Sequence, residues 1–206
     1  MRTSVHQVIG LAAFSAVIAA LACGSDSGSG GVSSGVDTTK PANMVTASDA
    51  QKVCSAIASY YASQITSDVV RRTVCVGVVA VQSVGMAPTV AQCNDSVNKC
   101  VANAQTSNTT TAATPPQVTC PGGVVPSQCT ATVGAIQACA TEIANQTRDR
   151  LAAINCNLYG LPPADAQAML RAATTVTVPA DCTAVQQSCP GIFAQLTATA
   201  PAPSSS

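Results

Sequence analysis

The chain has 206 residues, nine basic and nine acidic side chains, and a formal net charge of zero. Charged residues make up 9% of it and no basic run alternates with aromatic residues, so we expect no nucleic-acid partner. With three Tyr, two Phe and no Trp, a core would have to consist mostly of Ala, Val, Ile, Leu and Cys. Such small side chains bury little apolar area each, which favours a fold stabilised by disulfides.

The first residues have the order of an export signal. "MRTSVHQ" carries one Arg, "VIGLAAFSAVIAAL" is uncharged, and Ala22 precedes Cys23. Basic, apolar and small-residue segments in this order are typical of a signal peptide. The apolar run of 14 residues is shorter than the roughly 20 needed to cross a bilayer. We therefore predict a signal peptide of the lipoprotein type over residues 1–22.

Cys23 follows this apolar run directly and precedes "GSDSGSGGVSSG". The junction resembles the lipobox of bacterial lipoproteins, in which the thiol is acylated and becomes the new N-terminus. It departs from that pattern at Ala20, where Leu is commoner. The resemblance implies lipidation at Cys23, and Gly24 rather than Asp after it implies the outer membrane. The alternative is ordinary secretion with Cys23 free or in a disulfide.

Cysteine number supports the same interpretation. The chain has 11 Cys, and without Cys23 an even number remains. An exported chain this rich in cysteine is expected to form a disulfide framework in an oxidising compartment. Metal binding is disfavoured because no C-x-x-C pair occurs and the single His, His6, lies in the signal, so we expect no metal or cofactor. The predicted disulfide cysteines, with pairing open, are Cys54, Cys75, Cys93, Cys100, Cys120, Cys129, Cys139, Cys156, Cys182 and Cys189.

Composition divides the rest of the chain into a tether, a domain and a tail. Residues 23–47 are rich in Gly, Ser and Thr with no apolar period, which predicts a disordered tether. Residues 48–192 form the expected disulfide-rich domain, with a surface loop at about 106–118. Residues 193–206, ending in "APAPSSS", are expected to be a disordered tail.

Helical periodicity dominates the first half of the domain. Ser48 with Gln51 predicts a capping box, and apolar residues from Val53 to Ile65 follow at helical spacing. Residues 67–84 fit either a helix or a buried strand; their length and lack of strict alternation favour a helix. After Pro88, Cys93 and Cys100 lie on one predicted helix face, which suggests that both thiols face one partner.

The second half also has a helical pattern. One helix is expected from Pro126 through Cys129 to Ile143, and another around "TRDRLAAIN". Pro163 opens a further helix, and "PADCTAVQQSC" forms one that ends before Pro190. The predicted fold is all-α, a small disulfide-stapled bundle of about five to seven short helices behind a disordered N-terminal tether.

The predicted loop separates four cysteines from six. Without a bond across it, the number of possible pairings would fall roughly twentyfold, but nothing in the sequence forbids crossing. We expect one domain, with two subdomains as the alternative. The stretches "VAQCNDSVNKC", "PSQCTATVGAIQAC" and "PADCTAVQQSC" also echo one another, either as a reused helical unit or by chance.

A family resemblance rests on several of these stretches. The lipobox-like start, the Ser/Gly segment and the order "KVCSAIASYYASQ", "RRTVCVGV", "QCNDSVNKC" and "SQCTATVGAIQAC" resemble the cysteine-rich lipoproteins found in large numbers in myxobacteria. The resemblance covers most of residues 20–190. It implies export, lipid anchoring and disulfides, and it brings no catalytic residue.

The sequence offers little catalytic chemistry. Without a His beyond His6 there is no Ser-His or Cys-His dyad, and no P-loop or G-x-S-x-G motif occurs. We expect a non-enzymatic, lipid-anchored outer-membrane protein, on the periplasmic or the surface face, that acts as a structural module or binds an envelope protein or polymer. Its oligomeric state is open. The alternative is a carrier for a lipid or other hydrophobic ligand between helices, which would need an internal apolar pocket.

Overall fold

The computed structural model describes residues 30–82, 88–106, 118, 120, 128–175 and 177–198. Their regular structure is helical, apart from one isolated bridge between Pro41 and Thr132. This confirms the all-α prediction. The elements are η1 (Ala42–Met44), α1 (Ala47–Gln64), α2 (Ser67–Gln82), α3 (Val90–Thr106), α4 (Val133–Ala153), η2 (Cys156–Gly160), α5 (Pro163–Thr174), η3 (Ala180–Cys182), α6 (Thr183–Ser188) and α7 (Pro190–Ala198).

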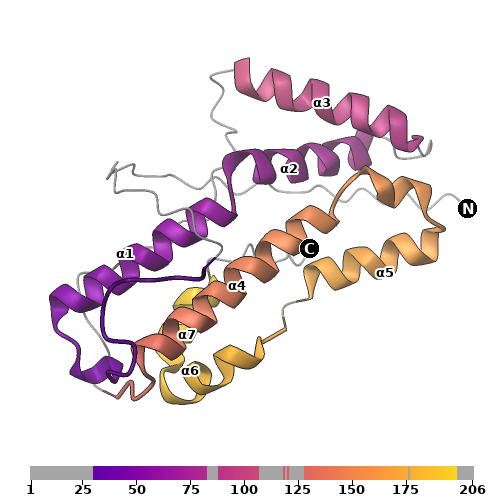
Figure 1. Cartoon of the computed structure of the whole chain (residues 1–206). Helices are drawn as coiled ribbons and strands as arrows, with labels where there is room; N and C mark the ends of the chain where they lie inside the picture. The colour runs from indigo at the N-terminus through magenta and orange to yellow at the C-terminus, as the bar shows by residue number, and fades with distance from the viewer. Residues whose placement is uncertain are drawn as a thin grey trace, which may run out of the picture.

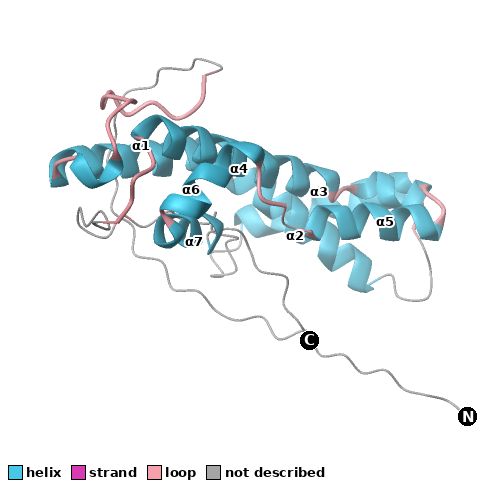
Figure 2. Ribbon diagram, turned by 90° about the horizontal axis from the view of Figure 1, so that it is seen from below, coloured by secondary structure: helices cyan, strands magenta, loops and turns pink. Residues whose placement is uncertain are grey.

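Helix α4 is the central element. Its 21 residues give a length of about 30 Å, and α1 lies alongside it (Figure 1). The pair α2 and α3 packs beyond the C-terminal end of α1, and α5 runs back beside the second half of α4. The short helices α6 and α7 cover another side of α4 (Figure 2). Helices α1, α2, α5, α6 and α7 thus contact one long helix, and α3 packs on α2.

The N-cap of α1 lies two residues before the predicted one. Thr46 is the N-cap, and its side-chain oxygen accepts a hydrogen bond from the Asp49 backbone N–H at 3.1 Å. The predicted capping box of Ser48 and Gln51 is therefore wrong. The predicted apolar face is confirmed, because Ile57 and Tyr61 are buried.

Residues 67–82 form a helix and not a strand. Cys75, Val76 and Val79 are buried, whereas Val74 and Val78 are exposed. This one-sided burial at helical spacing is what an amphipathic helix produces, and tertiary packing outweighs the strand preference of the many valines.

Helix α3 begins with a reciprocal capping box. The Thr89 backbone N–H donates to Gln92 Oε1 at 2.9 Å, and the Gln92 N–H donates to Thr89 Oγ1 at 3.2 Å. Two N–H groups that the helix cannot satisfy internally thus find partners. The predicted helix after Pro88 is confirmed.

Helix α4 begins later than predicted and is longer. Thr132 is its N-cap and accepts from the Ala135 N–H at 3.2 Å, so Pro126 and Cys129 precede the helix. The stretch "TRDRLAAIN", expected as a separate helix, continues α4 to Ala153. The prediction failed because Cys129 happens to fall at helical spacing from the residues that follow it.

Polar contacts accompany the apolar seam between α1 and α4. The Tyr60 hydroxyl donates to Asn145 Oδ1 at 3.2 Å. The buried Tyr61 hydroxyl lies 3.1 Å from Thr147 Oγ1, which itself donates to the Ile143 carbonyl at 2.8 Å. The hydroxyl of the largest buried side chain therefore has a partner, as burial of a polar atom requires.

Two clusters of buried side chains result. The main core joins α1, α4, α6 and the N-terminal segment, and the second core joins α2, α3 and η2. The main core contains Val32, Ala42, Val53, Ile57, Tyr61, Ile65, Cys129, Ala131, Val133, Ile136, Cys139, Ala140, Ile143, Ala144, Cys182, Val185 and Cys189. The second core contains Cys75, Val76, Val79, Cys93, Val97 and Cys156.

Both ends of the predicted domain need correction. Residues 30–46, expected within a disordered tether, pack on the helices, and Val32 and Ala42 are buried. Residues 193–198, expected within a disordered tail, belong to α7, and Phe193 packs against the main core. Apolar residues in these stretches find partners far away in sequence. The remaining parts of the predicted tether and tail, and most of the predicted loop, lie outside the described residues.

Candidate functional site

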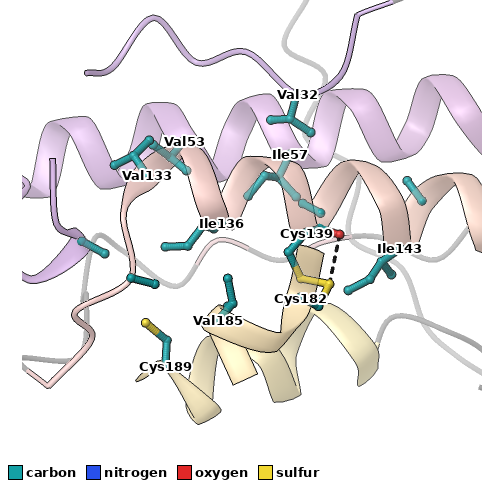
Figure 3. Close-up of a cluster of buried hydrophobic side chains, with 14 of the residues drawn as sticks. Val32, Val53, Ile57, Val133, Ile136, Cys139, Ile143, Cys182, Val185 and Cys189 are labelled. Atoms are coloured by element: carbon teal, nitrogen blue, oxygen red, sulfur yellow. Dashed lines mark hydrogen bonds between the residues drawn. A yellow bond between two sulfur atoms is a disulfide. The ribbon is translucent and has the colours of Figure 1, made fainter. Parts of the chain in front are cut away.

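Two disulfides join α4 and the segment before it to the two cysteines that flank α6. Cys139 bonds Cys182 and Cys129 bonds Cys189, with Cα–Cα distances of 4.5 and 4.6 Å. The later cysteine of one sequence echo thus bonds the earlier cysteine of the other. Val185 lies between Cys182 and Cys189 on α6 and is fully buried (Figure 3).

Two further disulfides hold the second core. Cys75 of α2 bonds Cys100 of α3, and Cys93 of α3 bonds Cys156 of η2. The expectation that Cys93 and Cys100 face one partner is wrong. Seven residues return a helix to within about 20° of the same direction, but α3 contacts both α2 and η2, and Cys100 bonds the first while Cys93 bonds the second. One helix stripe therefore serves two neighbours.

The fifth disulfide joins Cys54 of α1 to Cys120. Both cysteines are half-buried, and nearby Val118 packs against the main core. This bond and Cys93–Cys156 connect the two sides of the predicted loop, closing separations of 66 and 63 residues. Pairing within each half alone, which the sequence left open, is therefore excluded, and the two halves are joined as the single domain that we expected.

All ten predicted disulfide cysteines are paired with one another. The prediction of a disulfide framework is confirmed for each of them. Cys23, the predicted lipidation site, lies outside the described residues. It is the only cysteine of the sequence not used in these five bonds.

Residues 30–46 form a strap across the start of α4. The first-turn N–H groups of a helix have no partner inside the helix. Here the Val133 N–H donates to the Lys40 carbonyl at 3.0 Å, and the Gly134 N–H donates to the Thr38 carbonyl at 2.9 Å. The strap thus supplies acceptors that α4 needs at its N-terminus.

The strap is also held further along α4. The Val32 N–H donates to Thr141 Oγ1 at 2.8 Å. Gln137 is buried, with 6% exposure, and its Nε2 donates to Ser34 Oγ at 2.6 Å. Val32 itself points into the main core beside Ile57 (Figure 3). The strap therefore satisfies a buried polar side chain and adds an apolar one.

Two glycines allow this close approach. A Cβ on Gly31 would lie 2.5 Å from Thr141 Oγ1, and a Cβ on Gly134 would lie 3.0 Å from the Thr38 carbonyl oxygen. The neighbouring Gly30 has open space around its Cα. Gly31 and Gly134 are thus needed where the strap meets α4, and Gly30 is not.

Charged groups beside the strap are few. Asp37 Oδ1 accepts from the Thr39 hydroxyl at 2.7 Å and the Thr39 N–H at 2.9 Å, and these hydrogen bonds lower the pKa of Asp37. The hydrogen bond with Thr46, followed by Lys52 and Lys40, lowers the pKa of Asp49. Asp37 is solvent-exposed and stabilises a turn, and Asp49 is half-buried in the first turn of α1.

The described residues contain no group of three or more His, Cys, Asp or Glu side chains placed to hold a metal ion. The Tyr159 hydroxyl, next to the second core, is buried without a hydrogen-bond partner among them, and burial raises the pKa of Tyr159. A neutral phenol is the form that such a site favours.

Within the described ranges, no helix is long and apolar enough to span a bilayer.

The strap is the feature that sequence reasoning missed. Its only signals were Val32, Val36 and Val45, scattered in a polar stretch, and all three contact the main core.

No family model, curated protein or solved structure matches the chain.

Proposed function

We propose that this chain is an exported lipoprotein, anchored in the outer membrane through an acylated Cys23. Its disulfide-linked helical domain acts there as a non-enzymatic module that binds an envelope protein or polymer. The resemblance to the cysteine-rich lipoproteins of myxobacteria supports this proposal, as does the lipobox-like junction at Ala22 and Cys23.

The observation that carries the proposal is the complete pairing of the other cysteines. Ten cysteines form five disulfides, which indicates folding in an oxidising compartment outside the cytoplasm. An unpaired eleventh thiol would be a liability there, because it could exchange with these bonds. Acylation of Cys23 removes that liability and uses the one thiol that the framework leaves over.

The domain suits a display role better than a catalytic one. Several of its described polar side chains serve structural roles in helix caps, in the α1–α4 seam and in the strap. The chain has no His beyond His6 for general acid–base work near neutral pH. Disulfides that connect distant segments keep a small-residue core rigid, which a binding surface requires.

Intact mass of the protein extracted from its native membrane tests this proposal. We expect an acyl adduct on an N-terminal Cys23, no free thiol before reduction, and ten alkylated thiols after reduction. Cys23→Ser is the matched control, because it should lose the adduct and the membrane association while keeping all five disulfides. An unacylated chain, or free thiols before reduction, would contradict the proposal.

A further inference from the structure

The strap changes how far the domain can stand from an anchor on Cys23. If the ordered domain began at residue 48, 25 residues would separate the two, and extended chain would span up to roughly 85 Å. The packed domain instead begins near Gly30, seven residues after Cys23. Seven residues span at most about 25 Å.

The strap leaves the domain at a defined place. The first contacts are the Val32 N–H bond to Thr141 Oγ1 and the close approach of Gly31 to the same side chain, near the middle of α4. The strap and the α6–α7 pair lie on opposite sides of α4 (Figure 2). Figure 3 shows the same order, with Val32 on one side of α4 and Val185 on the other.

We propose that the strap is a mount that turns the strap-bearing side of α1 and α4 toward the bilayer surface and leaves α6 and α7 facing away from it. This inference rests on the proposed anchor at Cys23. The short connection holds the contact point at Thr141 within about 25 Å of the lipid surface.

Several contacts hold the strap on α4. Release of the strap would expose Val32, which is buried. It would also remove the carbonyl acceptors of the Val133 and Gly134 N–H groups. Gln137 would lose Ser34 and be left as a buried amide without this partner. A released strap would return the domain to a tether of roughly 80 Å with no preferred orientation.

The test uses the full-length, acylated protein on phosphatidylethanolamine and phosphatidylglycerol vesicles that contain an acceptor-labelled lipid. A clickable amino acid carries a donor dye at one of two exposed positions. Ala138 is on the face of α4 that carries Gly134 and Thr141, and Gln187 is on α6. We expect the donor at Ala138 to lose clearly more emission to the acceptor lipids than the donor at Gln187.

Strap variants supply the matched controls. Gly31→Ala should collide with Thr141 and release the strap, whereas Gly30→Ala has open space and should behave as the wild type. Val32→Asp is a second release variant, because it would bury a charge in the main core. Protease cleavage within residues 30–46 verifies release, and CD verifies that the helices persist. In released variants we expect the difference between the two donors to disappear.

The outcomes separate this inference from the proposed function. Acylated, vesicle-bound protein with equal losses at both positions would overturn the mount and leave the anchor intact. A difference that persists after verified strap release would also overturn it. A chain that is unacylated and does not bind vesicles would overturn the proposed function and the mount together.

Discussion

The main core and the second core are stabilised by different proportions of apolar burial and disulfide bonds. The main core buries seventeen residues, four of them cysteines, and includes Tyr61, Ile57 and Ile65. The second core buries six residues, of which Cys75, Cys93 and Cys156 are half. Where few apolar side chains are buried, disulfides contribute part of the stabilising free energy that a larger buried area would have supplied. The α2–α3 region should therefore depend on its disulfides more than the α1–α4 region does.

Removing Cys93–Cys156 should have the largest effect. Its loop of 63 residues corresponds to about 4 kcal/mol of stabilisation. We expect the double variant Cys93→Ala and Cys156→Ala to lose hydrogen-exchange protection in α3 before α1. The matched control is the double variant Cys54→Ala and Cys120→Ala. It removes a disulfide with a nearly equal loop of 66 residues, but these two cysteines are only half-buried. If both double variants lost equal hydrogen-exchange protection in α3, the prediction that the second core depends on Cys93–Cys156 would be contradicted.

Two valine truncations sharpen the comparison at single side chains. Val185 lies between two disulfides that resist collapse, so Val185→Ala should leave a cavity and cost roughly 2 to 3 kcal/mol. Val97 also lies between two disulfide-bonded cysteines, Cys93 and Cys100, but it belongs to the smaller core and is 4% exposed. Its half-buried neighbour Val101 can adjust, so Val97→Ala should cost about 1 to 2 kcal/mol. Chemical denaturation measures both. A larger loss for Val97→Ala would show that the second core is the stiffer one.

The strap should be weaker than either core. In the unacylated domain, Gly31→Ala should abolish slow exchange of the Val32 amide and lower the free energy of unfolding by about 1 kcal/mol. Gly30→Ala should leave both unchanged, because its Cβ meets nothing. Indistinguishable amide exchange in the two variants would disprove the close-approach argument.

Acid should have the smallest effect, and it should act on the main-core side. Hydrogen bonds lower the pKa of Asp37 and Asp49 from the ordinary 3.8. Their stabilisation is therefore present above 3.8 and is lost as the pH falls through the lowered values. Asp49→Asn should reduce this acid sensitivity at the start of α1. NMR of the Asp49 amide across an acid titration would detect it, and an unchanged titration profile in the variant would refute the assignment.

Local pattern determined much of the fold. The apolar face of α1, the helix that begins at Pro163, and the disulfide role of ten cysteines all follow from spacing and composition, and for α2 the sequence favoured a helix over a strand. Helical periodicity is visible in sequence because residues three and four apart share a face whatever the helix packs against. The lipobox-like junction at Cys23 is also a sequence pattern, and lipidation there stays a prediction.

Tertiary structure decided what depends on distant partners. Ten thiols can pair in many ways, and only the placement of α3 between α2 and η2 assigns Cys93 and Cys100 to different neighbours. The strap has a composition typical of a tether, yet it is ordered because Ser34, Thr38 and Lys40 meet polar groups of α4 that lack partners within the helix. No local pattern encodes that match, since donor and acceptor lie about a hundred residues apart in the chain.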